Sequence, residues 1–119
     1  MIEGIGIDVV DISRFQESME RTPALREKLF TSREAVLPVS SLAARFAAKE
    51  AFSKAIGLGM RMPMTWRSLQ TLNEVSGKPV TSYSGALARF MTEKQWQAQV
   101  TVSDELDMAI AFVVVTEQN

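Results

Sequence analysis

Apolar residues recur with two different spacings along the chain, and the spacing changes near position 11. From Ile2 to Val10 isoleucine and valine dominate, with Gly4 and Gly6 between them, which predicts a strand. Glycines inside a strand often mark a place where another backbone comes close. Over 12–21 the apolar residues recur instead at helical spacing, and Asp11 can cap the helix that this pattern predicts.

Capping and stop signals predict three more helical segments in the first half of the chain. These are a short helix from Thr22-Pro23 to about Leu29, a short turn that begins with the capping-box pattern Thr31 to Glu34 and ends by Pro38, and an alanine-rich helix from Leu42 to Ile56, opened by Ser41 and closed by Gly57. The last of these is the longest and most strongly marked helix of the sequence.

The second half of the chain predicts mainly strands. We expect strands over Arg67 to Asn73 and Val80 to Tyr83, a helix from Ser84 or Gly85 to about Gln95, and a final hairpin of Gln99 to Ser103 and Met108 to Thr116. The order of elements indicates a mixed α+β fold rather than a regular βαβ alternation. No repeat or linker divides the chain, so residues 1–119 are predicted to form one domain.

The composition restricts the chemistry that the chain can perform. The sequence contains no cysteine and no histidine, which excludes thiolate nucleophiles, disulfides, and the usual general base and transition-metal ligand. Acid–base catalysis and metal binding must therefore depend on Asp, Glu, Lys or water. Oxygen ligands favour a hard ion such as Mg²⁺.

Charge and hydropathy limit the expected partners. The net charge of −1 argues against nucleic acid, whereas basic side chains outnumber acidic ones between Arg14 and Arg33, which suggests an acidic partner or a phosphate. Apolar runs are too short to cross a membrane, and the start of the sequence has no signal-peptide pattern, so the cytoplasm is the expected location.

Two carboxylates are the first candidates for chemistry, although each also has a purely structural interpretation. Asp8 lies near the end of the predicted first strand, where it could be no more than a solvated polar residue. Glu50 lies in the long helix four residues before Lys54, a spacing that is also typical of a surface ion pair.

The surroundings of Glu50 favour a site for a metal-bound phosphate. Arg45 and Lys49 form a stripe with Ser53 beside it, and these cations with Lys54 could hold an anion while the carboxylate binds a metal ion on it. Gly57-Leu58-Gly59 could let the backbone pass close to a ligand, but Gly57 is explained equally well as a helix stop.

Taken together, these segments resemble a known family. Two motifs resemble the signatures of bacterial holo-acyl-carrier-protein synthases, the short type of 4′-phosphopantetheinyl transferase. The first is Gly4-Ile5-Gly6-Ile7-Asp8-Val9-Val10-Asp11-Ile12-Ser13-Arg14-Phe15. The second consists of Phe30-Thr31 and Glu34, followed by residues 42–55. Asn73-Glu74 and Gly77-Lys78-Pro79 match a weaker third element. The resemblance implies a small α+β domain with a mostly antiparallel sheet and a long central helix. It also implies a homotrimer with active sites at the subunit interfaces.

The resemblance also implies an activity and roles for particular residues. Phosphopantetheine would pass from coenzyme A to a serine of an apo acyl carrier protein, in support of fatty acid biosynthesis. Asp8 and Glu50 would bind Mg²⁺, and Lys54 would lie at the phosphate. The remaining implied roles are coenzyme A binding by Arg45, Lys49, Gly57, Gly59 and Pro79, and carrier-protein binding by Arg14, Arg21 and Arg26.

Some questions stay open from the sequence. The serine proton needs an acceptor, and a metal-polarised water or an acidic residue is favoured over Lys54, which would first need a strongly lowered pKa. Many family members read His-Val-Ser-x-Ser-His where this chain has Gln99 to Asp104. A binding module without turnover is one alternative, and the intact Asp8, Glu50 and Lys54 argue against it. A plain α+β scaffold is the other, which each residue taken singly would favour and only their joint spacing opposes.

Overall fold

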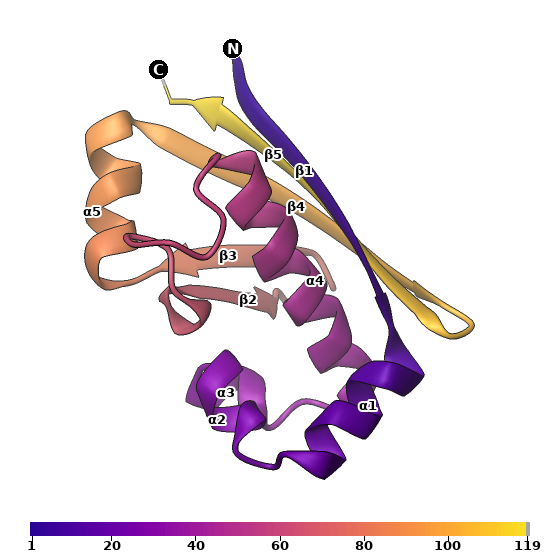
Figure 1. Ribbon diagram of the computed structural model, residues 1–119. Helices are drawn as coiled ribbons and strands as arrows, with labels where there is room; N and C mark the ends of the chain where they lie inside the picture. The colour runs from indigo at the N-terminus through magenta and orange to yellow at the C-terminus, as the bar shows by residue number, and fades with distance from the viewer. Residues whose placement is uncertain (119) are drawn as a thin grey trace.

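The first and last strands of the chain pair with each other, which brings the two termini side by side (Figure 1). The computed structural model describes residues 1–118. Its elements are β1 (Ile2–Asp11), α1 (Ile12–Arg21), α2 (Leu25–Leu29), α3 (Ser32–Ala35), α4 (Val39–Ala55), η1 (Trp66–Ser68), β2 (Leu69–Asn73), β3 (Pro79–Tyr83), α5 (Gly85–Lys94), β4 (Trp96–Glu105) and β5 (Met108–Glu117). The small α+β fold with antiparallel sheets is confirmed.

The strands form two separate antiparallel sheets. One has three strands in the order β1-β5-β4, and the other is the β2–β3 hairpin. On β5 the side chains alternate strictly, with Ala109, Ala111, Val113 and Val115 buried on the face that α4 covers. The alternation therefore fixes which face of the larger sheet forms the core.

Helix α4 lies between the two sheets and is buried on nearly every side (Figure 1). Its alanines and Phe52 pack against the larger sheet on one side and against β2 and α5 on the other. A helix that is apolar around most of its circumference is buried in this way. The central helix predicted from the alanine-rich segment is confirmed.

Several element boundaries differ from the predictions. Helix α4 begins at Val39 rather than near Leu42, because Pro38 adopts the extended N-cap conformation and no side chain caps the helix. Helix α2 begins at Leu25, since the backbone first makes a turn over 22–24. Strand β4 begins at Trp96 rather than Gln99, because left-handed Gln95 ends α5 and the chain enters the sheet at once.

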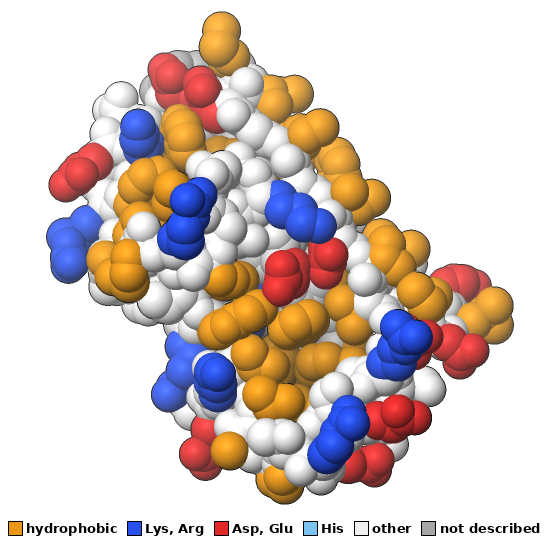
Figure 2. All heavy atoms as spheres, in the orientation of Figure 1, with side chains coloured by type: hydrophobic (Ala, Val, Ile, Leu, Met, Phe, Trp, Pro, Cys, Tyr) orange, Lys and Arg blue, Asp and Glu red, His pale blue; other side chains and the backbone are white. Residues whose placement is uncertain are grey.

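The outer face of the larger sheet is apolar and exposed along β1 and β5. Ile5, Ile7 and Val9 on β1 lie opposite Val114, Phe112 and Ile110 on β5, and Ile5 remains 60% exposed. In Figure 2 hydrophobic side chains follow this edge of the molecule. Among residues 1–118, no helix is long and apolar enough to cross a membrane.

Candidate active site

The site is built where β1 crosses α4 at very short range. A Cβ atom added to Gly6 would lie 1.9 Å from the carbonyl oxygen of Ala51, and one added to Gly4 would lie 1.9 Å from that of Ala55. Any side chain larger than hydrogen would force the strand and the helix apart. The close approach that the glycines predicted is confirmed, and it sets the spacing between Asp8 and the last turns of α4.

Lys54 links the two elements beside this contact. Its Nζ lies 3.2 Å from Asp8 Oδ1 and 3.0 Å from the backbone oxygen of Ile7. The side chain of Lys54 is 52% exposed, whereas that of Asp8 is 20% exposed. The intrahelical ion pair with Glu50, which was the structural interpretation of the i,i+4 spacing, is not formed within the described chain; Lys54 pairs with Asp8 instead.

Glu50 and Asp8 lie close enough to affect one another. Partial burial raises the pKa of Glu50, the nearby Asp8 carboxylate raises it further, and Lys54 acts in the opposite direction. Two neighbouring carboxylates at an open edge therefore favour a bound cation. No group of three or more acidic ligands occurs among residues 1–118. Two carboxylates suit Mg²⁺, which keeps several waters and takes further oxygens from substrate phosphates.

An apolar groove of about 650 Å³ runs from this pair of carboxylates toward α1 and α2. Its lining includes Phe15, Leu25, Leu29, Phe46 and Trp66, with Asp8 and Glu50 at one end. Figure 2 shows the hydrophobic side chains gathered in this hollow, with acidic and basic side chains around it. The groove can therefore hold an apolar chain or surface whose charged end lies at the carboxylates.

Aromatic stacking shapes the floor of the groove. Phe46 lies one helical turn before Glu50, and its ring stacks on that of Trp66 with centroids 5.2 Å apart. Phe15 of α1 contacts Phe46 from the other side at 5.5 Å. Phe46 and Glu50 lie on the same face of α4, since both side chains line the groove.

The proposed carrier-binding arginines have three different environments. Arg14 lines the groove, and Arg21 is exposed at the end of α1. Arg26 is half-buried, and its Nη1 donates to the backbone oxygen of Ala35 at 2.6 Å. Arg26 therefore holds α2 against α3 in addition to any part in binding.

Arg45 and Lys49 require a correction, because they do not form an exposed cationic stripe beside Glu50. Lys49 is wholly buried, and its Nζ lies 2.9 Å from Oε1 of the equally buried Glu34. Arg45 is also buried and donates to the backbone oxygen of Thr71. Helical spacing placed the two cations on one face but could not show that this face is turned toward β2. In the single chain neither cation is accessible to a phosphate.

Burial also makes the charged forms of these two side chains less favourable. Desolvation lowers the pKa of Lys49, and the Glu34 carboxylate raises it in part. Desolvation likewise lowers the pKa of Arg45, again opposed by Glu34. The buried acid Glu34 is thus the counter-ion for this part of the core. The capping box predicted for Thr31 and Glu34 is confirmed, but neither it nor the resemblance to the second signature indicated that Glu34 is a buried counter-ion.

The remaining predicted site residues lie in the loop after α4 and at the start of β3. Gly57 and Gly59 follow α4 with positive φ angles of 81° and 65°, and a Cβ on either would contact nothing within 4 Å. Open space and an exposed backbone leave room for a ligand beside them. Pro79 pairs with Asn73 in the β2–β3 hairpin and is not part of the groove lining.

The strand that lacks the family's histidines places its polar residues on the outer face of the sheet. Gln99 and Thr101 on β4 are exposed beside Val114 and Phe112. Asp104 is exposed near the end of the same strand. None of these residues lines the groove in the single chain.

Sequence reasoning missed one side of the groove. Leu25, Lys28 and Leu29 of α2, with Trp66, face the carboxylates from segments far from them in the sequence. The only signal was the presence of apolar residues in a short helix, which is equally typical of core packing. Nothing in the spacing connects α2 to Glu50.

Comparisons with known proteins show the family and the fold to which the chain is similar. Residues 4–113 match the model of the 4′-phosphopantetheinyl transferase superfamily. The holo-[acyl-carrier-protein] synthase of Polynucleobacter asymbioticus is 58% identical across 99% of this chain and 100% of its own length. The crystal structure of that synthase from Neisseria meningitidis matches with a TM-score of 0.91 and 36% identity, covering 98% of this chain and 100% of the other. The Helicobacter pylori synthase in complex with coenzyme A matches with a TM-score of 0.85 and 30% identity, covering 94% and 99%.

Proposed function

This chain belongs to the holo-[acyl-carrier-protein] synthases of the 4′-phosphopantetheinyl transferase superfamily, so it transfers phosphopantetheine to an apo acyl carrier protein. We propose that Asp8, Glu50 and Lys54 carry out this transfer with Mg²⁺. The donor is coenzyme A, and the second product is adenosine 3′,5′-bisphosphate. The observation that carries the proposal is the cluster of two carboxylates and one ammonium at the end of an apolar groove. The reaction would supply holo carrier protein for fatty acid biosynthesis.

In this proposal the substrate's pyrophosphate lies at the open edge beside Asp8. The serine oxygen forms a bond to the phosphorus that carries the pantetheine arm, and the bond from that phosphorus to the leaving bisphosphate breaks. Mg²⁺, held by Asp8 and Glu50, would supply positive charge to the pyrophosphate oxygens. Lys54 neutralises charge on the departing phosphate, and positioning supplies most of the remaining acceleration.

The serine proton needs an acceptor during this step. Lys54 Nζ lies within reach of two oxygens, those of Asp8 and Ile7, so it serves as a hydrogen-bond donor in this geometry. A water at the metal or one of the two acidic residues is therefore the proposed acceptor.

The carrier protein is proposed to dock on α1 and α2. Arg14 at the groove and exposed Arg21 would contact acidic side chains of the carrier, with Arg26 beside them. Rim charges of this kind chiefly change association rates and salt dependence. The part of coenzyme A outside the groove is proposed to pass near Gly57 and Gly59.

The exposed apolar face of β1 and β5 supports a homotrimer with active sites at the subunit interfaces. Isolated apolar residues are common on surfaces, but a continuous row along two paired strands marks an interface. Lys54 lies beside this face, next to a shallow hollow lined by Ile5, Ile7 and Phe112. A neighbouring subunit could therefore complete the site. The cytoplasm remains the expected location, which fractionation of expressing cells would check.

One assay tests the proposed function. The protein is incubated with apo carrier protein, coenzyme A and Mg²⁺, and the intact mass of the carrier is measured. We expect the mass to rise by one phosphopantetheine group, and to stay unchanged when Mg²⁺ is chelated or coenzyme A is omitted. Bound coenzyme A without any mass gain would favour the non-catalytic binding module instead.

A further inference from the structure

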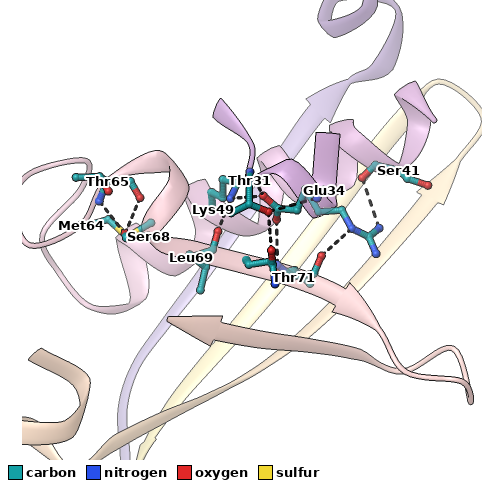
Figure 3. A network of polar contacts seen from close by, with 11 residues as sticks. Thr31, Glu34, Ser41, Lys49, Met64, Thr65, Ser68, Leu69 and Thr71 are labelled. Atoms are coloured by element: carbon teal, nitrogen blue, oxygen red, sulfur yellow. Dashed lines mark hydrogen bonds and ion pairs between the residues drawn. The ribbon is translucent and has the colours of Figure 1, made fainter. Parts of the chain in front are cut away.

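The inner edge of β2 is paired by side chains rather than by another strand. Within residues 1–118, β3 is the one strand that pairs with β2, so the other edge of β2 would leave unpaired peptide groups in the protein interior. Oε2 of Glu34 accepts the N–H of Thr71 at 3.0 Å, and Nε of Arg45 donates to the oxygen of the same residue at 3.1 Å. Lys49 donates to the backbone oxygen of Leu69. Charged side chains from α3 and α4 thus take the place of a neighbouring strand (Figure 3).

Glu34 is the centre of this network. Its side chain is wholly buried, and its Oε1 accepts the N–H of Thr31 at 3.0 Å while lying 2.9 Å from Lys49 Nζ. Thr31 in turn donates its hydroxyl to Gln70 Oε1 at 2.6 Å. Helix α3 has four residues, too few to be stable alone, so these contacts fix its place.

Helix α2 is attached to α3 and follows its position. Two residues separate them, Arg26 donates across the junction to the backbone oxygen of Ala35, and Phe30 between them is buried against Phe15. Helix α2 also contacts η1, which carries Trp66 directly before β2. The wall of the groove opposite Asp8 and Glu50 is therefore held by the β2 edge.

We propose that Glu34 is a positioning residue, which through Lys49 and the edge of β2 fixes the α2 wall of the groove and so sets the affinity for the carrier protein. The inference rests on the proposed function, since it assigns this wall to the carrier side of the groove. Glu34 itself touches no substrate, because it has no exposed surface. Its effect passes through α3 to Leu25, Lys28 and Leu29.

The first test is hydrogen exchange in the Glu34→Gln variant, with Leu87→Ala as the matched control. Leu87 is also wholly buried, but it belongs to the core around α5 and does not line the groove. We expect the amides of 25–35 to exchange on the order of tenfold faster in Glu34→Gln, while those of β1 and β5 keep their protection. Leu87→Ala should not loosen 25–35 selectively. Equal exchange of 25–35 in the two variants would overturn the proposal.

The second test is steady-state kinetics well below the melting temperature. For Glu34→Gln we expect the KM for carrier protein to rise on the order of tenfold, with the KM for coenzyme A nearly unchanged. A purely structural role predicts a lower Tm with both KM values unchanged, as expected for Leu87→Ala. That result would overturn the proposal.

Two further observations keep the outcomes separate. If Glu34→Gln does not fold, the Thr31→Val variant is used instead, because it removes only the hydroxyl contacts to Gln70 and Glu34. Faster hydrogen exchange confined to residues 25–35 is again expected. If the wild type transfers nothing, the proposed function fails, and the exchange comparison alone decides whether Glu34 positions the wall. If the wild type transfers normally and Glu34→Gln shows unchanged KM values and unchanged hydrogen exchange, only the positioning role of Glu34 is refuted.

Discussion

Glu50 shows at the scale of a single residue how the site is arranged for a cation. Burial and the neighbouring Asp8 raise its pKa, so the folded protein binds that proton more tightly than the unfolded chain does. This stabilisation is fully present below the ordinary carboxyl pKa and is lost as pH rises through the raised value. At neutral pH the ionised side chain therefore destabilises the metal-free fold.

Replacing Glu50 with glutamine should consequently stabilise the protein when no metal is present. We expect Glu50→Gln to have a higher Tm than the wild type at pH 7.5 in EDTA, with the difference disappearing below about pH 4, the ordinary range for Glu. Adding Mg²⁺ and coenzyme A should raise the Tm of the wild type and not that of the variant. Thermal unfolding in both conditions checks this, and a variant less stable than wild type at pH 7.5 would contradict it.

Lys54 is predicted to act in the reaction rather than in folding. Its ammonium is half exposed and bridges Asp8 and Ile7, so Lys54→Met should leave the Tm within a few degrees and lower kcat by about 100-fold. Lys54→Arg should restore part of the activity. Lys94→Met is the matched control, because Lys94 lies over Phe90 and Trp96 away from the site, and it should keep full activity. Equal loss in both methionine variants would remove the assigned role.

Single residues also show what the sequence could and could not reveal. Asp8 and Glu50 were found because two motifs resemble known signatures, whereas position alone left a structural interpretation for each. Arg45 and Lys49 were misjudged because spacing along a helix defines a face without saying what packs on it. The pairing of Lys49 with Glu34 depends on the tertiary position of α3.

At the scale of elements, the contact between β1 and α4 determines the site. Gly6→Ala would place a methyl group 1.9 Å from the backbone oxygen of Ala51, so the strand and the helix must separate. We expect a loss of stability of about 3 kcal/mol, together with a fall in activity as Asp8 moves away from Glu50. Urea unfolding and the transfer assay check both effects.

Ile5→Val is the matched control for this prediction. Ile5 neighbours Gly6 on the same strand, but its side chain lies on the opposite face from α4, so losing one methylene there should leave the separation of β1 and α4 unchanged and cost far less stability than Gly6→Ala. If Gly6→Ala were as stable as the wild type, the packing of β1 on α4 would not depend on the close approach at Gly6.

Most elements could be predicted because their signals are local. The glycine-bearing strand, the capping box at Thr31 and the glycine stop after α4 are confirmed. The starts of α2, α4 and β4 were displaced, since a turn, an extended proline and a left-handed glutamine set them. These backbone conformations depend on how the next element packs in the fold.

At the scale of the whole molecule, the exposed face of β1 and β5 is predicted to hold the trimer together. Ile5→Glu would place a charge in the middle of the apolar row, so we expect a monomer by light scattering and a loss of activity. Gln97→Glu on exposed β4 adds a charge to the polar part of the same sheet and should remain trimeric. A monomeric wild type would exclude the assembly.

The groove is the part of the molecule that the sequence could not reveal. It joins residues of β1, α1, α2, α4 and η1, and its α2 wall depends on a buried network that no local pattern encodes. The resemblance supplied a function for the residues at its end but not the shape of the space beside them.

The joint role of Asp8 and Glu50 is tested most directly by a double-mutant cycle of transfer rates. We expect Asp8→Asn and Glu50→Gln each to lower kcat by about 100-fold or more, and the double variant to be little worse than either, because both losses remove the same metal ion. Near-normal transfer in either single variant, or losses that multiply in the double variant, would contradict a magnesium ion shared by the two carboxylates.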